Sequence, residues 1–497
     1  MHQVRSGEQV VSDIERDDLH REVQRTQGRL VQRTGYDTLG RQVWQSSDLL
    51  RSILEPERGR LWRSYRYDAS GELAERRDSV RGSVRYRYDP AGQLLQQARL
   101  ADNSVETFAW DAAGNLLDET ERSSRGHIEG NRLRMWQDMR FEYDAWGNLS
   151  VKRKGANQVQ RFTYDGQDRL LAVRTETLRG VTETRFAYDP LGRRIAKHET
   201  QTETVGMKHA PRTWRFVWQG LRLAQEIRET GTSSYVYSPD APYTPAARVD
   251  ALIAEAIASA AIDTAKRAAQ IYHFHTDLVG APLEVTDEAG DLVWAGRYAA
   301  WGKVERGEDS RLTPRIEQPL RYAGQYADEG TGLHYNTFRY YDPDVGRFIS
   351  QDPIGLMGGE NLYQYAPNPS LWIDPLGLNK TTWELFNASG ESMASGSMTP
   401  DAGARSIPGR VGDSEQKILR KLSEKFTSEE LANTRLVIDS KPSFIRMPNS
   451  GKVVPVQGMA PCEFCGNAME DFAKSKGMKI EYNYRGKTET YPKSSGC

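Results

Sequence analysis

Two cysteines near the end of the chain, Cys462 and Cys465, stand in the stretch PCEFC with the spacing C-x-x-C. The proline before them favours a helix start, where thiolates are stabilised and both sulfurs point at one centre. By itself this spacing fits a redox pair, half of a zinc finger or two buried thiols. A thioredoxin-like pair needs a preceding βαβ half, which is missing. Because Cys497 is the only other cysteine and no histidine follows His334, a four-ligand Cys/His finger is excluded.

A second stretch with possible chemistry is GDSEQKILRKL, residues 412–422. Asp413 followed by Ser414-Glu415 is an ordinary capped helix start. The same residues could instead form part of an active site, because Asp413 and Glu415 both carry carboxylates at the start of a helix. The choice between these interpretations depends on whether the fold brings the two stretches close together.

The first 200 residues contain a repeat that predicts antiparallel hairpins. Aspartate at the first turn position and glycine at the fourth fit a type I turn, an aromatic residue ends the strand before it, and leucine or isoleucine begins the next. Stretches such as RSYRYD alternate aromatic and arginine side chains on opposite faces. One hairpin cannot bury its own face, so the hairpins must stack into a continuous sheet. The repeat aspartates are Asp37, Asp68, Asp89, Asp111, Asp144, Asp165 and Asp189.

These motifs resemble the YD repeats of the rearrangement-hotspot (Rhs) family, which is related to teneurins and to the C component of insect-killing toxin complexes. Residues 273–302 (HFHTDLVG…) and 321–378 (RYAGQYADEG…LWIDPLGL) strengthen the resemblance, which covers roughly residues 30–378. It implies a mainly β fold in which the hairpins spiral into a hollow β-cocoon around a C-terminal toxin. A repeat scaffold of another shape, such as a propeller, is the alternative. The alanine-rich stretch 245–270 departs from the repeat, and we expect a helical insert there that crosses or plugs the shell.

Two near-identical pentapeptides, DPIGL at 352–356 and DPLGL at 374–378, stand 22 residues apart. Their residue types alone predict two turns with a proline and a glycine. The Rhs resemblance implies self-cleavage after the second one, between Leu378 and Asn379, by an aspartyl-protease chemistry. Asp352 and Asp374 would share a proton, one acting as acid while the other activates water, with Arg347 nearby to tune them. We therefore divide the chain into a shell, 1–378, and a C-terminal domain, 379–497.

The C-terminal domain predicts the order β-β-α-β-α-β(β). Two short strands surround a turn at Ser389-Gly390, helices begin near 413 and 461, and a strand lies at TRLVIDS between them. A Pro/Gly-rich loop covers 441–460, and a strand or hairpin ends the domain. This order and its motifs resemble the small α/β cytidine-deaminase-like fold, particularly the deaminase toxins of bacterial polymorphic toxins.

Zinc deaminases carry H-x-E followed by P-C-x-x-C, with three protein ligands and an open position for water. The resemblance implies Zn²⁺ on Asp413, Cys462 and Cys465, with Glu415 as general acid and base. Asp413 stands where the family has histidine. The ligand set then carries a formal charge of −3, which makes zinc-bound water less acidic and puts the rate in doubt. It does not change the expected reaction, removal of an amino group from cytosine or adenine.

Composition limits the partners. The formal net charge is −1 and mean hydropathy is −0.70; residues 379–497 hold 17 Lys+Arg against 14 Asp+Glu, and the rest 50 against 54. Binding of single-stranded DNA or RNA is allowed by this contrast but not demonstrated by it. We expect no membrane span and no signal peptide. By resemblance we expect synthesis in the bacterial cytoplasm, export by a secretion apparatus, action in a target cell, and a cognate immunity protein. The alternatives are a container with a non-catalytic zinc-stabilised binding module, or a toxin of another chemistry such as a nuclease.

Overall fold

A computed structural model describes most of the first 378 residues and the strands that follow them. The described residues are 3–6, 9–49, 61–117, 126–252, 269–305, 316–355 and 361–378; beyond these they are 381–386, 392–398, 435–439, 443–446, 453–456, 469, 473–474, 479–484 and 487–491. The chain divides into two compact units. Unit 1 comprises residues 1–350 and 363–377, and unit 2 comprises residues 351–362 and 378–497.

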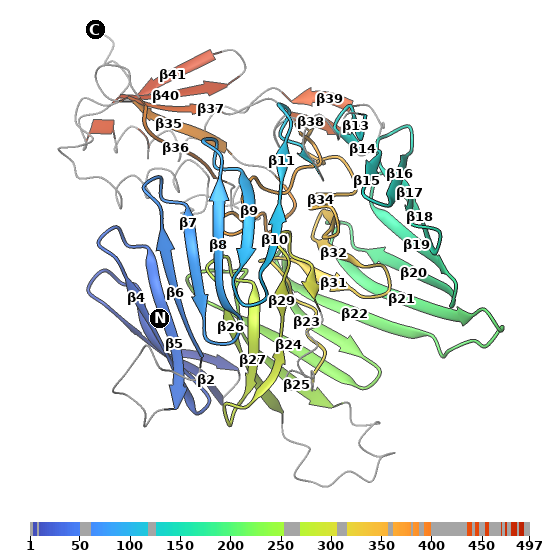
Figure 1. Cartoon of the computed structure of the whole chain (residues 1–497), viewed down its shortest axis with the longest axis horizontal. Helices are drawn as coiled ribbons and strands as arrows, with labels where there is room; N and C mark the ends of the chain where they lie inside the picture. Colours follow the sequence, from blue (N-terminus) through green and yellow to red (C-terminus); the bar gives the residue numbers. More distant parts are fainter. Residues whose placement is uncertain are drawn as a thin grey trace. The chain divides into compact units, whose positions relative to one another are not determined.

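Unit 1 is built from two long antiparallel sheets in which every strand pairs with its neighbours in sequence (Figure 1). The first contains β1 (Gln3–Ser6), β2 (Gln9–Arg16), β3 (Glu22–Gln27), β4 (Leu30–Tyr36), β5 (Gln42–Leu49), β6 (Leu61–Tyr67), β7 (Leu73–Asp78), β8 (Gly82–Tyr88), β9 (Leu94–Arg99) and β10 (Ser104–Thr107). The second contains β15 (Met135–Trp136), β16 (Met139–Tyr143), β17 (Leu149–Lys154), β18 (Gln158–Tyr164), β19 (Leu170–Thr177), β20 (Gly180–Tyr188), β21 (Arg194–Glu203), β22 (Arg212–Gln219), β23 (Arg222–Arg228), β24 (Gly231–Tyr237), β25 (Pro245–Leu252), β26 (Gln270–Thr276), β27 (Pro282–Asp287) and β28 (Leu292–Ala295).

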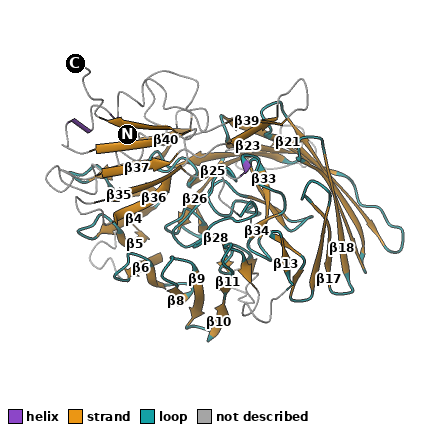
Figure 2. Cartoon of the chain, turned by 90° about the horizontal axis from the view of Figure 1, so that it is seen from above, coloured by secondary structure: helices purple, strands orange, loops and turns teal. Residues whose placement is uncertain are grey.

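Short hairpins complete unit 1. Between the two sheets lie β11 (Ala109–Trp110), β12 (Leu116–Leu117), β13 (Ile128–Glu129) and β14 (Arg132–Leu133). After the second sheet come β29 (Arg297–Tyr298), β30 (Val304–Glu305), β31 (Tyr326–Asp328), β32 (Leu333–Asn336), β33 (Arg339–Asp342) and β34 (Arg347–Phe348). In Figure 2 the strands of the second sheet curve around the segment that carries β33 and β34.

The repeat turns have the predicted geometry. At the turn between β4 and β5, the Gly40 N–H donates to the Asp37 carbonyl at 3.0 Å, and Gly40 has φ +76. The Asp37 carboxylate accepts the N–H groups of Leu39 and Arg41 at 3.0 and 2.9 Å, and its other oxygen accepts the Arg41 Nε–H at 2.8 Å. Aspartate therefore suits the first turn position, because its carboxylate satisfies the backbone of the turn and holds an arginine.

An aromatic residue near the end of a strand, in most cases the one before a repeat aspartate, links one hairpin to the previous one. Its polar hydrogen donates to the carbonyl of the first or second residue of the strand after the previous turn. The pairs are Tyr36–Glu22, Tyr67–Gln42, Tyr88–Leu73, Trp110–Leu94, Tyr164–Leu149, Tyr188–Leu170, Trp218–Arg194 and Tyr237–Leu223, at 2.6–3.0 Å. An aromatic ring can fill the core and still reach a backbone acceptor with its edge, which explains the choice of Tyr or Trp.

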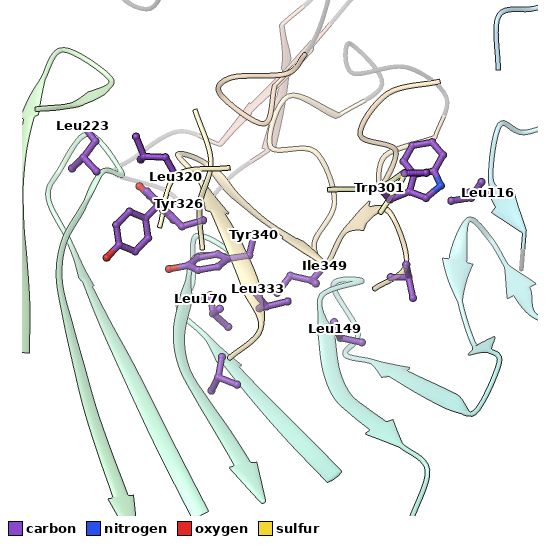
Figure 3. Close-up of a cluster of buried hydrophobic side chains, with 14 of the residues drawn as sticks. Leu116, Leu149, Leu170, Leu223, Trp301, Leu320, Tyr326, Leu333, Tyr340 and Ile349 are labelled. Carbon is purple, nitrogen blue, oxygen red and sulfur yellow. The ribbon is translucent and has the colours of Figure 1, made fainter. Parts of the chain in front are cut away.

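The main core of unit 1 lies between the repeat sheets and the segment 300–349. Figure 3 shows the leucines that follow repeat turns, Leu116, Leu149, Leu170 and Leu223, facing residues of that segment such as Tyr340. The first sheet packs against β26–β28 through buried polar contacts, including Gln27 Nε2 to the Phe274 carbonyl at 2.9 Å. A mainly β shell, as predicted, is thus closed by its own C-terminal segment.

One prediction about the shell is wrong. Residues 245–252 form the strand β25 instead of the start of a helix, and they pair on both sides, with β24 and β26. Alanine favours helices by less than about 1 kcal/mol per residue, and strand pairing on both sides overrides that preference. The remainder of the predicted insert, 253–268, lies outside the described residues.

Unit 2 contains a five-stranded sheet in the order β36-β35-β37-β40-β41. Its strands are β35 (Thr381–Phe386), β36 (Ser392–Met398), β37 (Arg435–Asp439), β40 (Lys479–Tyr484) and β41 (Lys487–Tyr491). The predicted opening hairpin, middle strand and final hairpin are confirmed. A separate hairpin, β38 (Ser443–Arg446) and β39 (Val453–Val456), occupies part of the predicted loop 441–460.

Candidate functional site

The second pentapeptide loop, residues 374–377, is bound by the turn between β32 and β33. Asn336 Nδ2 donates to the Asp374 carbonyl at 2.8 Å, and the Phe338 N–H donates to the Leu376 carbonyl at 3.3 Å. Arg339 Nε donates to the Gly377 carbonyl at 2.6 Å. The turn can present these donors together because Thr337 has φ +52, which closes the hairpin tightly.

The Asp374 carboxyl is buried, and its electrostatic partner is Arg339. The Arg339 Nη2 and Asp374 Oδ2 atoms are 3.4 Å apart, and the two side chains are only 2% and 5% exposed. The guanidinium also lies over the Phe348 ring, 3.6 Å from its centre. Burial, and then the charge of Asp374, raise the pKa of Tyr365 far above its ordinary value, so this phenol stays protonated beside the carboxyl.

Asp352 occupies a turn of the same type in unit 2. Its backbone N–H donates to the Leu362 carbonyl at 2.9 Å, and its carbonyl accepts the Gly355 N–H at 2.8 Å. Its carboxylate Oδ1 accepts the Ile354 N–H at 3.1 Å, and the residue is buried. Asp352 and Asp374 belong to different compact units, so their predicted pairing as a dyad stays a prediction.

Arg347, the arginine chosen from the sequence, contacts other groups. Its Nη2 donates to the Asn131 carbonyl at 2.5 Å and to Asn115 Oδ1 at 3.3 Å, and its guanidinium lies over the Tyr363 ring. Burial lowers its pKa. Sequence reasoning missed Arg339, because nothing in the strand sequence FRYYD distinguishes this arginine from exposed strand arginines of the repeats such as Arg66.

The predicted deaminase residues, Asp413, Glu415, Cys462 and Cys465, lie outside the described residues, as does Asn379 of the predicted scissile bond. The described strands of unit 2 nevertheless set the directions of the chain. β35 is antiparallel to both β36 and β37, and β37 is parallel to β40.

Met398, which ends β36, is therefore at the same edge of the sheet as Asp439, which ends β37. Thr381 pairs with Met398, and Thr382 pairs with Asp439. Both of the connections in which helices were predicted leave the sheet from this one edge.

Stacked Tyr-Asp hairpins closed by an interior segment define a YD-repeat shell. The chain belongs to the Rhs/YD-repeat family: residues 52–206 match the teneurin YD-shell model, and residues 271–307 match the RHS protein model. Within the described ranges, no helix is long and apolar enough to cross a membrane.

Several curated proteins are similar to the chain. It is 67% identical over 378 residues to "Double-stranded DNA deaminase toxin A" of Burkholderia cenocepacia, a match that covers 76% of this chain and 26% of the relative. It is 36% identical over 416 residues to "Toxin protein Tse5" of Pseudomonas aeruginosa, covering 73% and 30%. It is 30% identical over 355 residues to "Probable deoxyribonuclease RhsA" of Dickeya dadantii, covering 67% and 22%. The chain thus spans 22% to 30% of the length of these relatives.

Among solved structures, a Photorhabdus luminescens Tc holotoxin pore aligns with 74% of this chain and 19% of its own, at 16% identity and a TM-score of 0.47. A TM-score below 0.5 does not define the fold, which is therefore described from the strands of the chain itself.

Proposed function

We propose that residues 379–497 are a zinc-dependent nucleobase deaminase, carried by an Rhs-type toxin that acts on the DNA or RNA of a target cell. The observation that carries the proposal is the common edge of β36 and β37 in unit 2. Helices entered from that edge would bring the stretch DSE and the stretch PCEFC to one place, which is the arrangement that zinc deaminases need. The relative named as a DNA deaminase toxin supports the same reaction.

Each proposed residue has one task. Two thiolates and a carboxylate are a donor set suited to zinc, so Cys462, Cys465 and Asp413 would hold the ion. Zinc, when bound, would supply Lewis-acid chemistry for the attack of water on the base. Glu415 would carry a proton from the attacking water to the amino group that leaves as ammonia.

The test uses the full chain, incubated with single-stranded and duplex DNA and with RNA that are then sequenced. We expect C-to-T or A-to-G changes that Glu415→Ala abolishes, and about one zinc per chain that Cys462→Ala loses. Cys497→Ala is the matched control, since it removes the cysteine outside the proposed ligand set. Zinc without base conversion, equal in wild type and Glu415→Ala, would refute the deaminase in favour of a zinc-stabilised binding module.

A nuclease is the second candidate, because one relative is named a probable deoxyribonuclease. The same incubation separates the two reactions. A nuclease shortens the nucleic acid on a denaturing gel, whereas a deaminase changes its sequence and leaves its length intact.

We also propose that the chain cleaves itself between Leu378 and Asn379, with Asp374 and Asp352 as the acid and base. The support is the buried Asp374 carboxyl, held by Arg339 next to the end of the bound loop 374–377. Wild type is expected to migrate as two fragments and Asp374→Asn as one. Asp277→Asn, which changes another turn aspartate of the shell, is expected to give two fragments. An intact wild-type chain would refute the proposal.

A further inference from the structure

The turn between β32 and β33 holds the chain just ahead of the proposed scissile bond. Its three donors, Asn336 Nδ2, the Phe338 N–H and Arg339 Nε, each bind a different carbonyl of the loop 374–377. Backbone carbonyls are the groups by which a binding site fixes a peptide independently of its side chains. Two donors are side chains and one is main chain. Because each donor binds its own carbonyl, the loop can bind to this turn in one register only.

Gly377 can bind to this turn because it has no side chain. A Cβ atom added at Gly377 would lie 2.9 Å from the Asn336 carbonyl oxygen and 3.3 Å from Arg339 Cβ. Gly377 also has φ +64, a conformation that other residues adopt at a cost. Gly220, in the turn between β22 and β23, has φ +60, but an added Cβ there would have no atom within 4 Å. The two glycines therefore share the backbone requirement and differ in the contact.

Asn336 is an unusual residue to retain for stability alone. It is fully buried, and its Oδ1 atom has no hydrogen-bond partner among the described residues, while its Nδ2 binds the Asp374 carbonyl. A buried acceptor without a partner destabilises a fold. The benefit of the asparagine must therefore come from the donor that it directs at the loop.

The geometry points to the β32–β33 turn as the substrate-holding element of the proposed self-cleavage, with Asn336 and Gly377 as positioning residues that select the Leu378–Asn379 bond. This inference rests on the proposed function. The reaction consumes one water molecule: the Leu378–Asn379 amide bond breaks, Leu378 gains a carboxylate, and Asn379 gains a free amine. The turn contributes by fixing the bond relative to the acid and base, since misplacement by 1 Å can slow a reaction about a hundredfold.

The test measures the rate at which the two fragments appear in full chains pulse-labelled during cell-free synthesis. Gly377→Ala is expected to slow cleavage at least about tenfold, while Gly220→Ala, with the same backbone strain, cleaves at the wild-type rate. If wild type is not cut, the proposed self-cleavage is refuted, and the holding role is refuted with it. If wild type is cut and Asp374→Asn is not, but Gly377→Ala matches Gly220→Ala, the holding role alone is refuted.

A second variant separates holding from folding. Asn336→Asp keeps the shape and replaces the donor with a carboxylate that repels the Asp374 carbonyl. Protonation restores a donor, so the ratio of the Asn336→Asp rate to the wild-type rate is expected to rise as the pH falls from 7 to 4. Because protonation of a buried carboxyl also changes the stability of the fold, the free energy of unfolding of Asn336→Asp is measured at the same pH values. A rate ratio that only follows the fraction of folded chain at each pH would mean that Asn336 acts through the stability of the shell, and it would overturn the inference.

Discussion

In unit 1, arginines form two kinds of ion pair: partly exposed pairs within a repeat turn and buried pairs with the segment 300–349. Two consecutive arginines show the difference. Arg193 pairs with Asp189 of its own turn at 2.6 Å, and both side chains are partly exposed. Arg194 is fully buried and pairs with Asp328 of β31, 134 residues away. The repeat turns thus use local, partly exposed ion pairs, whereas the closure of the shell uses buried ion pairs between distant segments.

The environment of Arg194 explains why its pair is strong. Its guanidinium lies 4.3 Å from the centre of the Tyr335 ring and 4.6 Å from that of Phe216, and Lys197 Nζ is 3.2 Å from Asp328 Oδ1. Burial alone would lower the pKa of Arg194, but Asp328 and the surrounding tyrosines hold it above its ordinary value. The charge is therefore present in the folded shell and must be paired there.

The largest expected effect comes from the matched variants Arg194→Met and Arg193→Met. Removing one member of a buried pair costs about 3–5 kcal/mol, so the free energy of unfolding should fall by this amount in Arg194→Met. An exposed pair contributes about 1 kcal/mol or less, so Arg193→Met should change little. Urea unfolding of the full chain, followed by tryptophan fluorescence, measures both. Equal losses would remove the distinction between repeats and interior.

The pH dependence of the stability of unit 1 is also expected to come from a buried side chain. Burial, with a smaller contribution from Arg25, lowers the pKa of His273 on β26 to about 4. In the unfolded chain this pKa is about 6.5, so between these values the unfolded state binds more protons, and stability falls as the pH falls. The loss attributable to His273 begins near pH 6.5 and reaches about 3 kcal/mol at pH 4 and below.

His273→Gln is therefore expected to flatten the stability curve between pH 6.5 and 4, measured by urea unfolding at each pH. His198→Gln is the repeat control, because that ring is exposed on β21. If the stability curves of His273→Gln and wild type remain parallel through this range, the titration of His273 does not contribute to the pH dependence of stability.

A smaller effect is expected from removing the tyrosine hydroxyls that link one hairpin to the previous one. Tyr164→Phe removes the hydroxyl that donates to the Leu149 carbonyl at 2.9 Å and leaves this carbonyl without that donor. The loss should be about 1 kcal/mol, and Tyr237→Phe, which removes the equivalent bond to Leu223, should cost a similar amount. Thermal unfolding of each variant and of the double variant tests whether these links are independent, in which case the losses add. A double variant much less stable than this sum would contradict a local role.

Much of the repeat fold could be predicted from sequence because it is encoded locally. The Asp37 turn, the alternation of Tyr65 and Arg66, and the strands of unit 2 each follow from neighbouring residue types. The segment 245–252 could not be predicted, because its strand pairing on both sides depends on distant residues. Arg194 had a signal that was missed: it stands where most other repeats have leucine, and a charge at a core position requires a partner.

The candidate site was predictable in part for the same reason. The residue types of Asp374 and its loop suggested chemistry, but the identity of its arginine depends on how β33 packs, and Arg347 and Arg339 are equally plausible from sequence alone. The structure assigns Arg339 to Asp374 and Arg347 to Asn131. The proposed deaminase residues depend on sequence motifs and on the strand directions of unit 2.

The smallest expected effect sharpens the comparison most, because it predicts almost no change. Arg169 Nε lies 2.7 Å from Asp165 Oδ2, and its guanidinium lies over the Tyr188 ring of the next repeat, 5.4 Å from its centre. Both side chains of the ion pair are partly exposed, so Arg169→Met should lower stability by about 0.5 kcal/mol, and 1 M salt should reduce the difference further. Urea unfolding at low and high salt measures both quantities. A loss above about 2 kcal/mol that salt leaves unchanged would mean that repeat turns, like the interior pairs, act as single essential contacts.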